Sequence, residues 1–295
     1  QKMIYSDAMA IKDQKKREQL THDGFCVFNQ VLNAETVANL NAMSEWTIEK
    51  QRLDNPDHFE RHRSQGCIIP YWKYTHTAFA ELIANDGAMN SLAGLGFDQP
   101  KVWSGFVISK PPKSPPLYWH QDGVLWDHPI SLTGQPQQFF LMYYLVDTTP
   151  ENGCLRVIPG SHRQRHSIHD IPRKAHQDDA IGRAEDMQHP AMRKAEGEID
   201  VPVQAGDVVM GDSRLLHSAH GNNSDAWRTV LTIWYWPAYN ELPNEVKALV
   251  VRSLEDPTWQ SWVQNTQSIT KHLIPHYDGK YESISWNNQP GNNLE

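Results

Sequence analysis

The sequence of 295 residues has no excess of basic side chains, because 27 lysines and arginines stand against 35 aspartates and glutamates, for a formal net charge of −8. Nucleic acids and anionic membranes attract a basic protein face, so we expect neither of them as the main partner. No apolar run approaches the roughly 20 residues that a membrane-spanning helix requires. Internal repeats and low-complexity tracts are also missing, which leaves an ordinary globular composition.

Cysteine is scarce as well. Cys26, Cys67 and Cys154 are odd in number and have no paired spacing, which favours a reducing compartment over a disulfide framework. Residues 1–19 lack the apolar segment of a secretory signal peptide, and residues 291–295 show no peroxisomal tripeptide. We therefore expect a cytoplasmic protein.

The first third of the chain has helical patterns. Asn33 is a typical N-cap residue, and a helix is predicted over about 34–53. A second helix is predicted over about 77–95, where glycines follow the last apolar positions. A short run at 24–28 reads as a strand. Residues 1–100 are thus expected to form a helical flank.

From Lys101 onward the sequence pattern changes to short apolar runs separated by turn residues. These runs are Val102–Ile108, Phe139–Val146, Cys154–Ile158, Val208–Met210 and Thr229–Trp236. Helices followed by strands predict a mainly β fold, a barrel or sandwich with flanking N-terminal helices. We expect the barrel at about 101–240, a lid or insertion within it at about 163–197, and a C-terminal extension at about 241–295, all in a single domain over 1–295.

One short motif carries chemistry. Residues 119–123 read Trp-His-Gln-Asp-Gly, and side chains two positions apart on a strand point to the same face. His120 and Asp122 can therefore reach a common point. Two histidines and one carboxylate on one face of a metal ion are typical of non-haem Fe(II) oxygenases, because further coordination positions stay open. His-x-Asp alone is weak, since it is frequent by chance.

A third ligand is expected further along the chain. A strand ends on His217, turn residues follow at 221–225, and another strand begins near Arg228. If the two strands form a hairpin, His217 and Arg228 lie opposite each other, about 5.5 Å apart at Cα. A dicarboxylic acid could then chelate the metal at one end and meet the planar guanidinium at the other. Alone, Arg228 would read as a surface charge; together with the histidines and Asp122, the functional interpretation is favoured.

Five motifs in a fixed order resemble the phytanoyl-CoA dioxygenase family of Fe(II)/2-oxoglutarate oxygenases, over roughly residues 20–240. They are ISKPP at 108–112, WHQDG at 119–123, ENGCLRVIPGSHR at 151–163, GDVVMGD at 206–212 and RLLHSAHGNNSDAWR at 214–228. The third motif is the most specific. The spacing of eleven residues from the distal histidine to the arginine also matches the family.

The resemblance implies a double-stranded β-helix, which is a jelly-roll or cupin-like barrel, and the cofactors Fe(II), 2-oxoglutarate and O2. It implies that His120, Asp122 and His217 bind the metal and that Arg228 binds the far carboxylate of 2-oxoglutarate. The implied reaction is hydroxylation of a small organic metabolite with release of succinate and CO2. Desaturation, cyclisation and epimerisation remain open within the family. A cupin-like metalloenzyme that does not use 2-oxoglutarate and a non-catalytic binding module are the alternatives outside it.

Two further positions are implied to contact 2-oxoglutarate. Phe106 falls on a co-substrate-lining position, and Met142 falls where many relatives carry tryptophan. The chain departs from the family at Ala219, where a serine is common. Three alternatives follow for this hydroxyl: Ser218 supplies it, Thr232 supplies it, or the hydrogen bond is missing.

Other residues compete for these roles. His220 could be mistaken for the metal ligand, but side chains an odd number of positions apart on a strand face opposite ways, and the arginine spacing selects His217. Trp119 and Trp126 are candidate substrate contacts, by stacking or cation–π interaction, although core packing is the default interpretation for such rings. The sequence does not indicate an oligomeric state.

Overall fold

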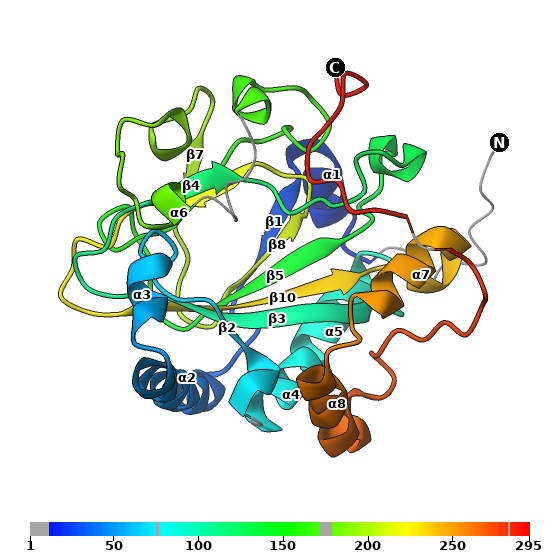
Figure 1. The fold of residues 1–295 in the computed structure, drawn as a ribbon, viewed down its shortest axis with the longest axis horizontal. Coiled ribbons are helices and arrows are strands. Elements are labelled where there is room, and N and C mark those ends of the chain that lie inside the picture. The colour runs from blue at the N-terminus through cyan, green and yellow to red at the C-terminus, as the bar shows by residue number, and fades with distance from the viewer. Residues whose placement is uncertain (1–11, 75–76, 172–178, 283) are drawn as a thin grey trace.

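The computed structural model describes residues 12–74, 77–171, 179–282 and 284–295. Over these residues the strands form two antiparallel sheets, and helices precede, interrupt and follow them (Figure 1). Residues 1–11 of the expected helical flank and 172–178 of the expected insertion lie outside the described residues.

The larger sheet has six strands in the order β1-β8-β5-β10-β3-β2. Each of the apolar runs predicted as strands lies in one of the two sheets. The strands of the larger sheet are β1 (Phe25–Phe28), β2 (Ile69–Pro70), β3 (Lys101–Lys110), β5 (Phe139–Tyr144), β8 (Val208–Asp212) and β10 (Arg228–Trp236). The smaller sheet has the order β4-β9-β6-β7, formed by β4 (Leu117–His120), β6 (Leu155–Val157), β7 (Ile199–Val201) and β9 (His217–Ala219).

The helices within residues 14–94 and the helix at 257–270 pack on one face of the larger sheet, whereas the smaller sheet lies on its other side (Figure 1). The alternation of side chains along strand β10 explains why both faces of the larger sheet are covered. Leu231 and Ile233 pack into the core with the helices, and Thr232 and Trp234 point to the space between the sheets. A strand buried on both faces reads as a nearly continuous apolar run, which is what this segment shows.

The helices are α1 (Gln14–Asp23), α2 (Ala34–Asp54), α3 (Asp57–Arg61), α4 (Thr77–Ile83), α5 (Asp86–Gly94), α6 (Asp179–Gly182), α7 (Asn244–Arg252) and α8 (Pro257–Thr270). The carboxamide of Asn33 accepts a hydrogen bond from the backbone N–H of Thr36 at 2.8 Å, so the predicted N-cap of α2 is confirmed. The single helix predicted over 77–95 is wrong. Asn85 caps a new helix there by accepting from the N–H of Ala88, so the chain forms α4 and α5 instead.

The chain has more helix than the expected mainly β class, since α2 alone has 21 residues and the longest strand has 10. The described parts of the expected lid or insertion pack against the smaller sheet. Ile168 and Ala195 belong to one core cluster with Trp119, and Met192 belongs to another with Tyr118. None of the described residues of 163–197 lines the large cavity at the site.

All three cysteines are buried and free, so the prediction of no disulfide framework is confirmed. Among the described residues, no helix has the length and apolar character needed to cross a bilayer.

Candidate metal and co-substrate site

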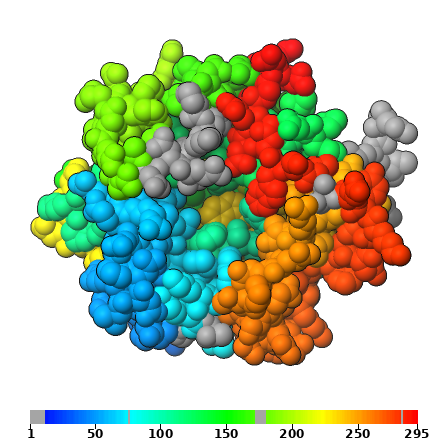
Figure 2. All heavy atoms as spheres, in the orientation of Figure 1, coloured from blue at the N-terminus to red at the C-terminus, as the bar shows by residue number. Residues whose placement is uncertain are grey.

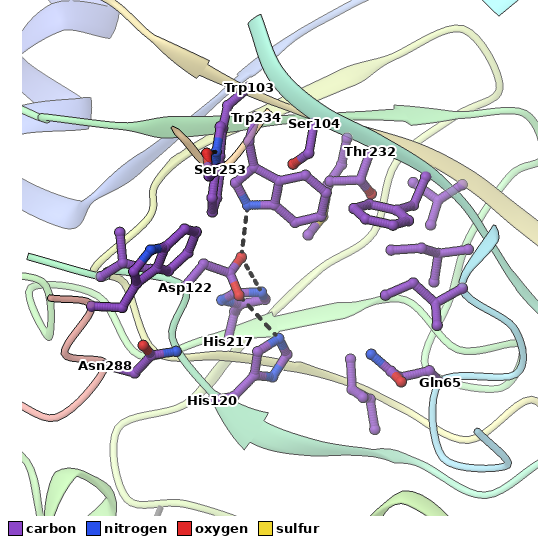
Figure 3. Close-up of a pocket in the computed structure, with 18 of the residues that line it drawn as sticks. Gln65, Trp103, Ser104, His120, Asp122, His217, Thr232, Trp234, Ser253 and Asn288 are labelled. Atoms are coloured by element: carbon purple, nitrogen blue, oxygen red, sulfur yellow. Dashed lines mark hydrogen bonds and ion pairs between the residues drawn. The ribbon is translucent and has the colours of Figure 1, made fainter. Parts of the chain in front are cut away.

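Two strands of the smaller sheet bring the predicted metal ligands together. His120 at the end of β4 is the register partner of His217 at the start of β9, and their ring centroids are 4.2 Å apart. Asp122 lies just beyond β4, where its N–H donates to the carbonyl of Ser213 at 2.7 Å. Its carboxylate faces both rings, with 3.7 Å from each histidine Nε2 to the nearer carboxylate oxygen (Figure 3).

Backbone carbonyls fix the orientation of both imidazoles. The Nδ1 of His120 is 3.0 Å from the carbonyl of Tyr118, and the Nδ1 of His217 is 3.0 Å from that of Leu215. A carbonyl only accepts, so Nδ1 carries a hydrogen in each ring and Nε2 is the nitrogen that faces the proposed metal position. Metal-binding histidines are held in this way in general. Ligand atoms of the three side chains lie within 4.8 Å of one another, a spacing that a single ion can bridge.

Trp234 on β10 fixes the carboxylate from the opposite sheet. Its indole Nε1 donates to Oδ2 of Asp122 at 3.0 Å (Figure 3). The sequence alone did not assign Trp234 a role at the site. Its position on an alternating strand that carries Arg228 and Thr232 on the same face is the signal that could have identified it.

His220 lies in a different environment. Its Nε2 is 2.6 Å from Oδ1 of Asp200, and together with Cys154 these two residues form a separate group of possible ligand atoms. The structure thus brings His217, and not His220, to His120 and Asp122.

A cavity of about 810 Å³ opens beside the three ligands, between the two sheets. Figure 2 shows the hollow at the centre of one face of the molecule, between the blue N-terminal part, the orange helices and the red C-terminal segment. Strand β10 is paired with β3 on one side and β5 on the other, which places Thr232 between Phe106 and Met142 in one row. All three line the cavity, so the two positions implied by family resemblance lie on either side of Thr232.

Arg228 begins β10 at the inner part of this cavity, and its residue exposure is 4 %. Burial lowers the pKa of its guanidinium, and the neighbouring groups that oppose this are the weak acids Tyr144, Cys154 and Cys67. No ion pair to Arg228 and no hydrogen-bond partner of its buried Nε are found among the described residues. A buried cation without a carboxylate is costly, and the arrangement suits an anionic ligand.

Lys110 is the register partner of Arg228 and is also fully buried. Its Nζ donates to the carbonyls of Ser64 and Pro115 at 2.6 and 2.5 Å. Burial and the neighbouring Arg228 hold its pKa well below the usual range for lysine. Lys110 therefore already has acceptors, which leaves Arg228 as the better anion-binding group.

The expected hairpin between His217 and Arg228 is wrong. Strand β9 pairs with β4 and β6 in the smaller sheet, and β10 pairs with β3 and β5 in the larger one. The turn residues between them carry the chain from one sheet to the other. Buried Asn222 holds this crossing by donating to the carbonyls of Lys110 and Ala226. The side chains of His217 and Arg228 still line the same cavity, from opposite sides.

The two hydroxyls considered beside Ala219 differ in their partners. Ser218 donates to the carbonyl of Leu117 at 2.6 Å and accepts from Arg156 at 2.8 Å. Thr232 Oγ1 is buried and has no hydrogen-bond partner within the described part of the chain. Thr232 is therefore the hydroxyl that remains for a bound co-substrate.

The model of the phytanoyl-CoA dioxygenase (PhyH) family matches residues 20–230 of this chain. The chain belongs to the phytanoyl-CoA dioxygenase family. An L-proline trans-4-hydroxylase of Streptomyces griseoviridis is 30 % identical over 132 residues, 40 % of this chain and 47 % of the hydroxylase. The match thus spans about half the length of that relative. An ectoine dioxygenase of Sphingopyxis alaskensis is 25 % identical over 211 residues, 68 % of each chain.

One solved structure is similar in fold to this chain. The epimerase SnoN, in complex with Fe3+, alpha ketoglutarate and nogalamycin RO, matches with a TM-score of 0.56 at 16 % identity, over 95 % of this chain and 96 % of that one. The part matched by the family model contains the three possible metal ligands and Arg228. Residues beyond it, among them Leu249, Trp259 and Trp286, also line the cavity.

Neither Trp119 nor Trp126 is among the residues that line this cavity, which corrects their assignment as substrate contacts. Trp119 alternates with His120 on β4; its ring lies 5.1 Å from the guanidinium carbon of Arg156, and its Nε1 donates to the carbonyl of Arg193. Trp126 is buried and donates to the side chain of Gln121 at 3.2 Å. Both rings serve packing, as the default interpretation had it.

Proposed function

We propose that this protein is an Fe(II)- and 2-oxoglutarate-dependent dioxygenase that oxidises a small organic molecule and releases succinate and CO2. The observation that carries the proposal is the pairing of two features across one cavity. His120, Asp122 and His217 converge from the smaller sheet, and the buried cation Arg228 faces the cavity from the larger one. Relatives named as an L-proline hydroxylase and an ectoine dioxygenase support the same class.

The donor set fits iron. Two neutral imidazole nitrogens and one carboxylate suit Fe(II) and leave other coordination positions open for co-substrate and O2. The chain's own contribution is to hold these donors in place, by the carbonyls that accept from the two Nδ1–H groups and by the indole of Trp234 on Asp122. A ferrous ion bound there would supply, with 2-oxoglutarate and O2, the oxidising power of the reaction.

The inner part of the cavity fits 2-oxoglutarate. Arg228 would hold the far carboxylate through two parallel hydrogen bonds, and the free hydroxyl of Thr232 would donate a further one. Phe106 and Met142 flank Thr232 and would cover the hydrocarbon part of the co-substrate. A metalloenzyme of this type that does not use 2-oxoglutarate would have no use for a buried arginine without a carboxylate.

We further propose that the two sheets form the double-stranded β-helix of this family, and that hydroxylation is the outcome. Asp122 would bind the metal at the coordination position that a halide would need, so halogenation is not expected. Desaturation, cyclisation and epimerisation share the same residues, and the name of SnoN as an epimerase is a reason to include them among the products sought.

Metal and co-substrate binding test the proposal. After anaerobic reconstitution with Fe(II), we expect one iron per chain and saturable binding of 2-oxoglutarate that depends on the metal. His217→Ala should lose both. A chain that binds 2-oxoglutarate equally well with and without iron would contradict the proposal.

A further inference from the structure

The cavity has an aromatic wall, which begins at Phe106 and Trp234 beside the proposed co-substrate and metal positions. Trp103 on β3 lies 5.0 Å from Trp286, centroid to centroid. Phe106 is 5.7 Å from Trp72 and 5.8 Å from Trp234. All five rings line the cavity. Rings at such distances present both faces and edges to a ligand and favour stacking with other ring systems.

Charge is sparse along this wall. Outside the proposed metal and 2-oxoglutarate positions, two fully charged side chains, Arg252 and Asp256, are found among the described cavity-lining residues. Asp256 already accepts from the backbone N–H groups of Thr258 and Trp259, as the N-cap of α8. A small zwitterion needs opposite charges placed close to the reacting position, and this wall offers mostly indole and aliphatic surface instead.

The cavity is also large for a compact substrate. Its volume of about 810 Å³ lies in the upper part of the range of roughly 300–1,000 Å³ that is typical of pockets for drug-sized ligands. 2-Oxoglutarate is a short chain and would occupy only the inner part, near Arg228. The space that remains fits a molecule with several rings.

The outer wall comes from the C-terminal segment, beyond the part matched by the family model. Its backbone is joined to the loop after Asp122, since the N–H of Asn287 donates to the carbonyl of Val124 at 2.9 Å. The side chain of Gln121 donates to the carbonyl of Asn288 at 2.5 Å. Gln121 is the chain neighbour of Asp122, so these bonds fix the segment relative to the metal ligands. Figure 3 shows Asn288 of this segment beside Asp122.

We propose that the substrate is a bulky, largely uncharged molecule with a polycyclic or aromatic ring system, and that the C-terminal segment, through Trp286 together with Trp103, determines this specificity. The inference rests on the proposed function, because it takes the inner cavity to be filled by iron and 2-oxoglutarate. The family-matched part thus supplies the oxidising site and much of the aromatic wall, including Trp103, and the C-terminal segment completes that wall with Trp286.

Ring binding can be measured without turnover. The probes are 9-anthracenemethanol as an uncharged three-ring alcohol, benzyl alcohol as its one-ring counterpart, and L-proline as a compact zwitterion. Calorimetry and quenching of tryptophan fluorescence give the Kd, for the metal-free protein and for the anaerobic protein with Fe(II) and 2-oxoglutarate. We expect the three-ring alcohol to bind about tenfold or more tightly than benzyl alcohol, and L-proline to show no saturable binding.

Two matched variants locate the binding. Trp286 and Trp46 are exposed to 44 % and 45 %, so replacing either with alanine leaves the core intact, and Trp46 on α2 is not among the cavity-lining residues. Trp286→Ala should weaken binding of 9-anthracenemethanol about tenfold, whereas Trp46→Ala should change it less than twofold.

Equal weakening by both variants, absence of saturable ring binding, or tighter binding of L-proline than of the three-ring alcohol would overturn the inference. The proposed function fails by a different result, namely the absence of iron or 2-oxoglutarate binding. The ring titration of the metal-free protein requires neither of these ligands.

Discussion

Arg228→Lys is the substitution whose effect follows most directly from the structure. Arg228 is 4 % exposed and lines the cavity, and the acidic groups near its guanidinium are the weak acids Tyr144, Cys154 and Cys67. Lysine keeps the positive charge but replaces the planar fork with a single ammonium. The change should therefore weaken 2-oxoglutarate binding and leave iron binding nearly intact.

The magnitude comes from the hydrogen bonds that are lost. A hydrogen bond to a charged group contributes about 1.5–3 kcal/mol, so replacing a two-bond contact with a one-point contact should raise the Kd or KM for 2-oxoglutarate about 10- to 150-fold. Titration of 2-oxoglutarate into the anaerobic iron-loaded protein measures this directly, with iron content determined on the same sample.

Arg214→Lys is a matched control, because Arg214 is also 4 % exposed but pairs with Asp212 at 2.6 Å and does not line the large cavity. It should lower the Tm without changing 2-oxoglutarate affinity. An Arg228→Lys protein that binds 2-oxoglutarate within twofold of the parent, or an equal loss of affinity in Arg214→Lys, would refute the assignment of Arg228.

Three other outcomes are expected. His217→Ala should abolish iron retention, measured by metal analysis after desalting, whereas His220→Ala keeps the metal because His220 bonds to Asp200; the reverse result would reassign the ligand. Trp234→Phe removes the hydrogen bond to Asp122 and should lower iron affinity or activity about 10- to 100-fold, whereas Trp103→Phe, which loses a bond to Ser253, leaves iron affinity unchanged. With any accepted substrate and high chloride, mass spectrometry should find no chlorinated product, and finding one would contradict Asp122 as a ligand.

Local patterns in the sequence predicted much of the site. His120 and Asp122 are two positions apart, so a short extended segment suffices to bring them together. Asn33 caps its helix by accepting a hydrogen bond from a backbone N–H only three positions away. Such features depend on backbone geometry over a few residues, which the residue types largely determine.

Features that depend on long-range packing were not predictable in the same way. A turn signal between His217 and Arg228 indicates that the chain reverses, but the sheet that each strand joins depends on its hydrogen-bond partners in β4 and β3. The tryptophans show the same limit. Trp126 and Trp286 are the same residue type, but the packing of the loop after Asp122 buries the first and the C-terminal segment brings the second to the cavity.

Succinate formation from 2-oxoglutarate is the measurement that tests the proposed function most directly. The purified protein, supplied with Fe(II), 2-oxoglutarate and O2, should form succinate at a rate that falls to background in His217→Ala, that falls strongly in Arg228→Lys at subsaturating 2-oxoglutarate, and that rises when a substrate is added. Succinate formation unchanged in His217→Ala, or no 2-oxoglutarate-dependent succinate from an iron-loaded protein under any substrate tested, would contradict it.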